Sequence, residues 1–133
     1  MKVGLKWTGT GEQFTGAVPG GVDVLTDGDN IAGPSPVALL VLSLGACMAI
    51  DVLDIAQKSR VTVTAMEVET EAERRPDPPR RLTAVRLRYA ITGPSASDEP
   101  KLQRAIDLSR DKYCSVLHSL RDDIDLSIEL EIR

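Results

Sequence analysis

Val37-Ala38-Leu39-Leu40-Val41-Leu42-Ser43-Leu44-Gly45-Ala46-Cys47-Met48-Ala49-Ile50: this apolar run decides the fold. It follows a chain breaker, Gly33-Pro34-Ser35-Pro36, in which Ser35 can cap a helix and Pro36 suits the first helical position. At 14 residues the run is shorter than the roughly 20 that span a bilayer. The pattern therefore predicts a helix from about Pro36 to about Ser59 that is buried on nearly all sides inside a soluble protein.

Such a helix needs apolar cover on every face, and one small sheet from its own chain covers only one. The sequence therefore predicts a homodimer, in which two copies of this helix pack together between two sheets. Ser43, Gly45 and Ala46 are small enough to let two backbones approach closely.

The remainder of the chain alternates like strands, with one amphipathic helix. Short strands are expected before the central helix, and two longer ones flank a loop at residues 74–81. The second helix follows Ser97, and a helical turn covers residues 113–120 before a final alternating strand at 124–132. The second helix has an inward stripe of Leu102, Ala105, Ile106 and Ser109. The predicted fold is one α+β domain over residues 1–133, with antiparallel sheets packed on the long buried central helix.

The two long alternating segments each carry charges on one face. If the loop closes the hairpin symmetrically, Glu67 faces Arg88 and Glu69 faces Arg86 on the wet face of the sheet. Each exposed pair of this kind contributes only ~0–1 kcal/mol. These charges therefore indicate a solvated face rather than a functional site.

Composition excludes several classes of protein. The net charge of −4 provides no basic surface for nucleic acid. The first residues alternate like a strand and lack the apolar core of a signal peptide, so we expect a cytoplasmic protein without a membrane segment. Two cysteines and one histidine, without close ligand spacing, argue against a metal site, and no cofactor is expected.

Cys47 and Cys114 are the candidate site residues, because each is the single cysteine of a buried helical segment. If they meet, a Cys47 thiolate can attack a peroxide O–O bond and become a sulfenic acid. Cys114 can then condense with that acid to form a disulfide. This chemistry requires a lowered pKa at Cys47, whereas an apolar setting raises it. The alternative is two inert core thiols, since free cysteine is among the most buried residue types.

Three polar residues lie close enough in sequence to the cysteines to act on a thiol. His118 lies one turn after Cys114, and we interpret it as a solvated or capping residue. Asp51 lies one turn after Cys47, where a carboxylate raises a thiol pKa, so we interpret it as marking where the helix leaves the core. Ser43 could donate to a thiolate, although serines inside helices usually bond their own backbone.

Two segments resemble the cysteine motifs of the OsmC/Ohr family. The first runs from Gly33-Pro34-Ser35-Pro36 through Leu44-Gly45-Ala46-Cys47-Met48-Ala49-Ile50-Asp51-Val52. The second is Lys112-Tyr113-Cys114-Ser115-Val116-Leu117-His118-Ser119-Leu120. The spacing from Pro36 to Cys47 and the order of strands and helices also fit, so the similarity spans essentially the whole chain.

The resemblance implies an intertwined α+β homodimer with two sites at the subunit interface. It further implies a thiol peroxidase that reduces organic hydroperoxides and is re-reduced by a small or lipoyl dithiol. Cys47 would be the reactive cysteine and Cys114 the resolving cysteine.

The sequence departs from the family at the groups that activate the thiol. Val37 and Ala38 stand where the family has a glutamate, and no arginine occurs before Arg60. Activation of Cys47 is then missing or comes from elsewhere, and we expect slow turnover with an alkaline shift of its pH profile. The open alternatives are a peroxidase, an OsmC-like protein that binds a small hydrophobic ligand or senses redox state through Cys47, and a binding protein with inert cysteines.

Overall fold

The first compact unit comprises residues 1–40 of the computed structural model, which describes residues 1–133. Three strands form an antiparallel sheet in the order β1-β2-β3: β1 (Gly4–Trp7), β2 (Gln13–Ala17) and β3 (Val24–Asp27). The carboxylate of Asp27 organises the loop that follows β3, because it accepts the backbone N–H groups of Asp29 and Ala32 at 3.1 and 2.9 Å.

Helix α1 (Pro36–Lys58) begins in the first unit and continues through the second, which comprises residues 41–133. As predicted, Ser35 caps it: the Ser35 hydroxyl accepts the backbone N–H of Ala38 at 3.3 Å. The helix ends one residue before the expected Ser59.

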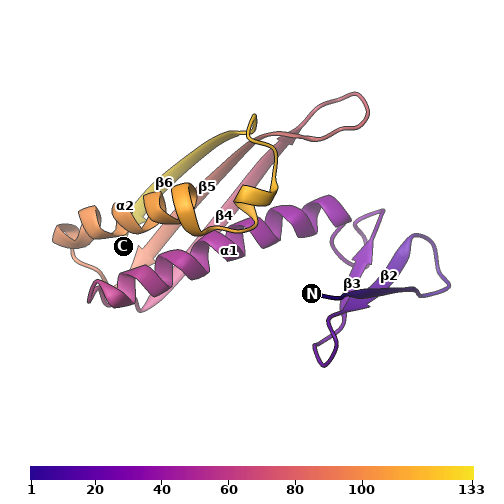
Figure 1. Ribbon diagram of the computed structural model, residues 1–133, viewed down its shortest axis with the longest axis horizontal. Coiled ribbons are helices and arrows are strands. Elements are labelled where there is room, and N and C mark those ends of the chain that lie inside the picture. Colours follow the sequence, from indigo (N-terminus) through magenta and orange to yellow (C-terminus); the bar gives the residue numbers. More distant parts are fainter. The chain divides into compact units, whose positions relative to one another are not determined.

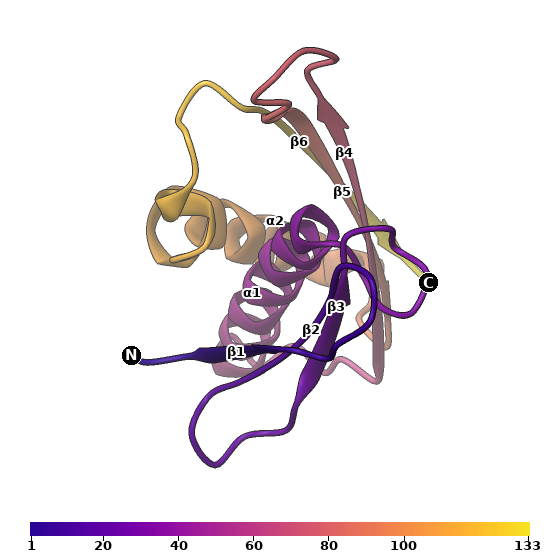
Figure 2. The same cartoon turned by 90° about the vertical axis from the view of Figure 1, so that its right-hand side faces the viewer.

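The second unit is a sheet covered on one face by helices. The sheet has the strand order β4-β5-β6, with β4 at Ala65–Arg74, β5 at Leu82–Thr92 and β6 at Asp125–Ile132. Helix α1 and helix α2 (Glu99–Leu108) both lie on the same side of this sheet (Figures 1 and 2). Short helical segments join these elements: η1 (Ala96–Asp98), η2 (Ser109–Tyr113) and η3 (Leu117–Ser119). The α+β class is confirmed. The expected stripe of α2 is also confirmed, since Leu102, Ala105, Ile106 and Ser109 are all fully buried.

The expectation of purely antiparallel sheets is wrong for the second sheet. Strands β4 and β5 are antiparallel, but β6 runs parallel to β5, with Leu87 opposite Ile128. A parallel pair needs a crossover connection, and the α2 segment supplies it between β5 and β6. Alternation within a strand reveals which residues share a face, but not the direction of the neighbouring strand.

The hairpin register also differs from the symmetric one. Glu69 pairs with Arg88 and Glu71 with Arg86, two residues along β4 from the predicted partners. A bulge between Glu73 and Arg74 shifts the ladder. The faces themselves are as predicted, because a shift of two residues leaves every side chain on its original face.

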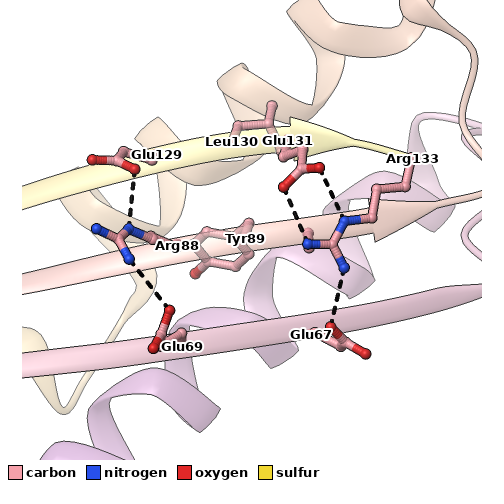
Figure 3. A pocket seen from close by; sticks show the side chains of 9 residues that line it. Glu67, Glu69, Arg88, Tyr89, Glu129, Leu130, Glu131 and Arg133 are labelled. Carbon is pink, nitrogen blue, oxygen red and sulfur yellow. Dashed lines mark hydrogen bonds and ion pairs between the residues drawn. The ribbon is translucent and has the colours of Figure 1, made fainter.

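The outer face of this sheet carries a row of ion pairs (Figure 3). Arg88 lies between Glu69 and Glu129, at 3.5 and 3.2 Å, and Arg133 lies between Glu67 and Glu131, at 3.3 and 3.0 Å. All of these side chains are largely exposed, so the pairs add little stability. These charges keep the outer face solvated. Tyr89 and its apolar neighbours are buried on the opposite face.

The prediction that the central helix is buried on nearly all sides does not hold within a single chain. Leu44, Met48, Val52 and Ala56 form its buried stripe. On other faces Leu42 remains 63% exposed and Ile50 67% exposed. By length and composition α1 could also cross a membrane, a property that core helices of soluble proteins share.

Gly45 shows how closely α1 approaches β4. A Cβ added at this glycine would lie 2.5 Å from the Thr70 hydroxyl, so any larger residue would force a shift. Beside this contact runs an apolar groove of about 360 Å³ between the helix and the strand. Its lining is Leu42, Gly45, Ala46, Ala49, Ile50, Leu53, Met66, Val68 and Thr70.

Candidate functional site

Cys47 and Cys114 meet in the second unit, as the sequence predicted. Cys47 projects from α1 and is half-buried, whereas Cys114 is fully buried at the end of η2. Their sulfur atoms and a carboxylate oxygen of Asp51 all lie within 4.8 Å of one another, and both thiols are free. The two cysteines are therefore close enough for a small side-chain adjustment to join them.

The chain after α2 brings Cys114 into place through an irregular helix. Segment η2 is a π-helical turn, a form that is rare and frequent at functional sites. Cys114 itself is extended and ends that turn, and the chain then re-enters a helical turn at η3. This path directs the backbone N–H of Leu117 at the Cys114 sulfur, 3.4 Å away.

Residues 114–116 surround the Cys47 thiol with hydrogen-bond donors. Burial raises the pKa of the Cys47 thiol, but hydrogen bonds from the Val116 backbone and from the side chains of Cys114 and Ser115 lower it by more. The Ser115 hydroxyl lies 3.9 Å from the Cys47 sulfur. The pKa of Cys47 is therefore below its ordinary value, even with the opposing charge of Asp51 nearby.

Cys114 has the opposite character. Burial raises the pKa of Cys114 to about 11, and the neighbouring Cys47 adds to this rise. The hydrogen bond from the backbone N–H of Leu117 acts in the opposite direction and lowers the pKa. Of the two thiols, Cys47 therefore ionises first, and the Cys114 thiol can donate to its sulfur. A nucleophilic cysteine requires this readiness to ionise, whereas a resolving cysteine must still lose its proton before it attacks.

The activation of Cys47 was the main feature that the sequence analysis missed. The absent glutamate and arginine suggested a largely protonated thiol, but backbone and hydroxyl donors can also stabilise a thiolate. The Val116 N–H has no signature in sequence because every residue except proline carries this group. These donors lower the pKa of Cys47, and the expected pH profile stays a prediction.

Asp51 faces the cysteine pair. Our interpretation that it only marks where the helix leaves the core is wrong. It lies four residues after Cys47, on the same face of α1, and is half-buried. The hydroxyl of fully buried Ser109 donates to its Oδ2 at 2.8 Å. The four-residue spacing of Cys47 and Asp51 places both on one face of the helix, and Ser109 lies in the inward stripe of the second helix. Sequence alone did not show that Asp51 and Ser109 meet.

Tyr89 is a buried neighbour of the same cluster. It is 1% exposed, and its hydroxyl is buried without a hydrogen-bond partner. Burial raises the pKa of Tyr89, and the charges of Cys114 and Asp51 raise it further. The phenol is therefore neutral at physiological pH and lies in the electrostatic field of the site.

Two other predicted neighbours have different surroundings. His118 is exposed, and its backbone N–H donates to the Cys114 carbonyl at 3.1 Å, in agreement with its interpretation as a solvated residue. The set of Cys47, Asp51 and Cys114 offers three groups of the types that bind metals, one fewer than a structural zinc site uses. We assign no metal to it.

The fold and site together define a class: an α+β protein in which a long helix places one thiol beside a second, buried thiol. The chain belongs to the OsmC-like protein family, whose sequence model matches residues 26–129. It is 36% identical to Protein YhfA of Escherichia coli K12 over 133 residues, which cover 99% of this chain and 98% of that protein.

Solved structures agree with this assignment. A hypothetical protein from Aquifex aeolicus VF5 is 26% identical, with a TM-score of 0.86 over 99% of this chain and 95% of that one. The organic hydroperoxide resistance protein OhrB of Bacillus subtilis is 17% identical, with a TM-score of 0.64 over 98% of this chain and 96% of that one. The second likeness concerns the fold alone.

Proposed function

We propose that this protein is a cytoplasmic thiol peroxidase that reduces organic hydroperoxides through Cys47 and Cys114. The observation that carries the proposal is the asymmetry of the thiol pair: the pKa of Cys47 is lowered while that of Cys114 is raised to about 11. A merely structural pair of core thiols needs no such difference. The printed function of the similarly folded OhrB is consistent with this chemistry.

The first step consumes the peroxide. The Cys47 thiolate attacks the outer oxygen of ROOH, the O–O bond breaks, and the alkoxide takes a proton to leave as ROH. Cys47 becomes a sulfenic acid, and the peroxide has gained two electrons. Cys114 then forms the disulfide with release of water, and a dithiol reductant restores both thiols by exchange.

Organic hydroperoxides are the expected substrates because the sequence around Cys47 is apolar. Ile50, three residues after Cys47 on α1, offers an exposed apolar side chain beside the thiol. Each methylene of a substrate that an apolar surface covers favours binding by ~0.8 kcal/mol. Cumene hydroperoxide should therefore react faster than hydrogen peroxide.

The active form is proposed to be a homodimer. Leu42 and Ile50 leave an apolar face of α1 exposed, beside the groove against β4. Large exposed apolar patches are characteristic of interaction surfaces. A second copy of this chain suits this face, because the small side chains of Ala46 and Ala49 allow two helices to approach closely.

Peroxide consumption with dithiothreitol as reductant tests the proposal. Wild type should consume cumene hydroperoxide in many turnovers, and Cys47→Ser should consume none. Cys114→Ser is the matched control, since it retains Cys47 and should complete the first oxidation but not the disulfide. Oxidation of wild-type Cys47 without turnover would instead indicate the redox-sensing alternative. No oxidation of Cys47 by either peroxide would refute the peroxidase.

A further inference from the structure

The resolving step poses a chemical problem at Cys114. This thiol must lose its proton before its sulfur can attack the Cys47 sulfenic acid, because the thiolate is the nucleophile. Burial, the largest cause of the raised pKa of Cys114, persists after Cys47 is oxidised, so this thiol stays mostly protonated at pH 7. Rapid disulfide formation therefore requires a base beside Cys114.

Most groups around Cys114 cannot be that base. Once oxidised, Cys47 is no longer a thiolate. Tyr89 is a neutral phenol, and the hydroxyl of Ser115 is a far weaker base than a carboxylate. His118 is exposed, and its backbone N–H, rather than its side chain, donates to the Cys114 carbonyl.

Asp51 remains, and its geometry suits the task. Its carboxylate oxygen lies within 4.8 Å of both sulfur atoms, a gap that one water molecule or a small side-chain rotation closes. The Ser109 hydroxyl, which is fully buried, donates to Oδ2 of the same carboxylate at 2.8 Å. The carboxylate is thus fixed by a neutral donor and directed toward the two reacting atoms.

We propose that Asp51 accepts the proton of Cys114 during disulfide formation and returns it to the departing oxygen. This inference rests on the proposed redox function of the thiol pair. Asp51 takes the proton from the Cys114 S–H, and the freed electron pair forms the S–S bond to Cys47. The Cys47 S–O bond breaks, and the hydroxide that leaves takes the proton from Asp51. One water is released, and Asp51 is again a carboxylate.

The test uses Ellman's reagent, a disulfide rather than a peroxide, on the fully reduced protein in the presence of EDTA. The Cys47 thiolate should release the first coloured thiolate, and attack of Cys114 on the resulting mixed disulfide should release the second. Asp51→Asn should leave the first phase unchanged or faster, because it removes a negative charge beside Cys47. The second phase should slow at least about tenfold, as expected when a general base is lost.

Two comparisons separate proton transfer from mere damage to the site. Asp54→Asn changes an exposed carboxylate of the same helix and should leave both phases unchanged. Raising the pH toward 11 should restore the second phase of Asp51→Asn, because Cys114 then ionises without a base. A second phase within threefold of wild type, or one slowed equally at every pH, would overturn the proposal.

This experiment also separates the two proposals. A protein that ignores peroxides but shows an Asp51-dependent second phase would retain the inference and lose the peroxidase function. With cumene hydroperoxide, Asp51→Asn should accumulate the Cys47 sulfenic acid, which a dimedone probe and intact mass would detect.

Discussion

Ile50→Gln should weaken the proposed homodimer strongly while leaving the folded chain intact. Ile50 lies on α1 and is 67% exposed in the single chain, so it contributes little to the core of its own subunit. Glutamine is a good helix former and is tolerated where a helix meets water. The substitution therefore removes apolar area chiefly from the surface that is proposed to meet the partner.

The magnitude follows from the exposed fraction. Full burial of an isoleucine side chain is worth about 2 kcal/mol, so the 67% still exposed corresponds to about 1.3 kcal/mol per copy. In a twofold dimer the same residue lies on both sides of the interface, which doubles the loss to about 2.7 kcal/mol. The dissociation constant should rise about 100-fold.

Sedimentation analysis over a nanomolar to micromolar dilution series measures this change. Gln57→Ala is the matched control, because it alters an exposed polar residue of the same helix and should leave the dissociation constant unchanged. Circular dichroism should show equal helix content in all three proteins. A monomeric wild type at micromolar concentration, or an Ile50→Gln dimer within threefold of wild type, would refute the reasoning.

The remaining predictions concern the site. Iodoacetamide at pH 7 should alkylate Cys47 well before Cys114, since only Cys47 has a lowered pKa; peptide mass mapping against time would show the opposite order if the assignment is wrong. Cys47→Ser should make Cys114 more reactive, because Cys47 contributes to the raised pKa of Cys114. The free energy of unfolding should fall as pH rises from about 9 to about 11, the window between the ordinary and the folded-state pKa of Cys114, and Cys114→Ser should flatten this fall in urea titrations. Tyr89→Phe should be neutral or stabilising by about 1 kcal/mol in the same titrations, because it removes a buried hydroxyl without a partner; a loss above about 1 kcal/mol would show that the hydroxyl is bonded.

Local rules were enough to predict the elements of this protein. Pro36 and the capping Ser35 locate the start of α1 because both act through their immediate neighbours. Alternation separates the charged and buried faces of β4 and β5, since side chains in a strand have a period of two. The two cysteine motifs together also indicated the family and the meeting of Cys47 with Cys114.

The tertiary structure decided the direction of β6, the register of the hairpin and the electrostatics of the thiol pair. A bulge at Glu73 and Arg74 and a crossover through α2 depend on packing between distant segments, which no local pattern encodes. The pKa of Cys47 depends on a backbone N–H at Val116, a group that every residue but proline has and that only the folded path of the chain can direct at the sulfur. Likewise, only the folded chain brings Asp51 beside both cysteines and within a hydrogen bond of Ser109, which is 58 positions away.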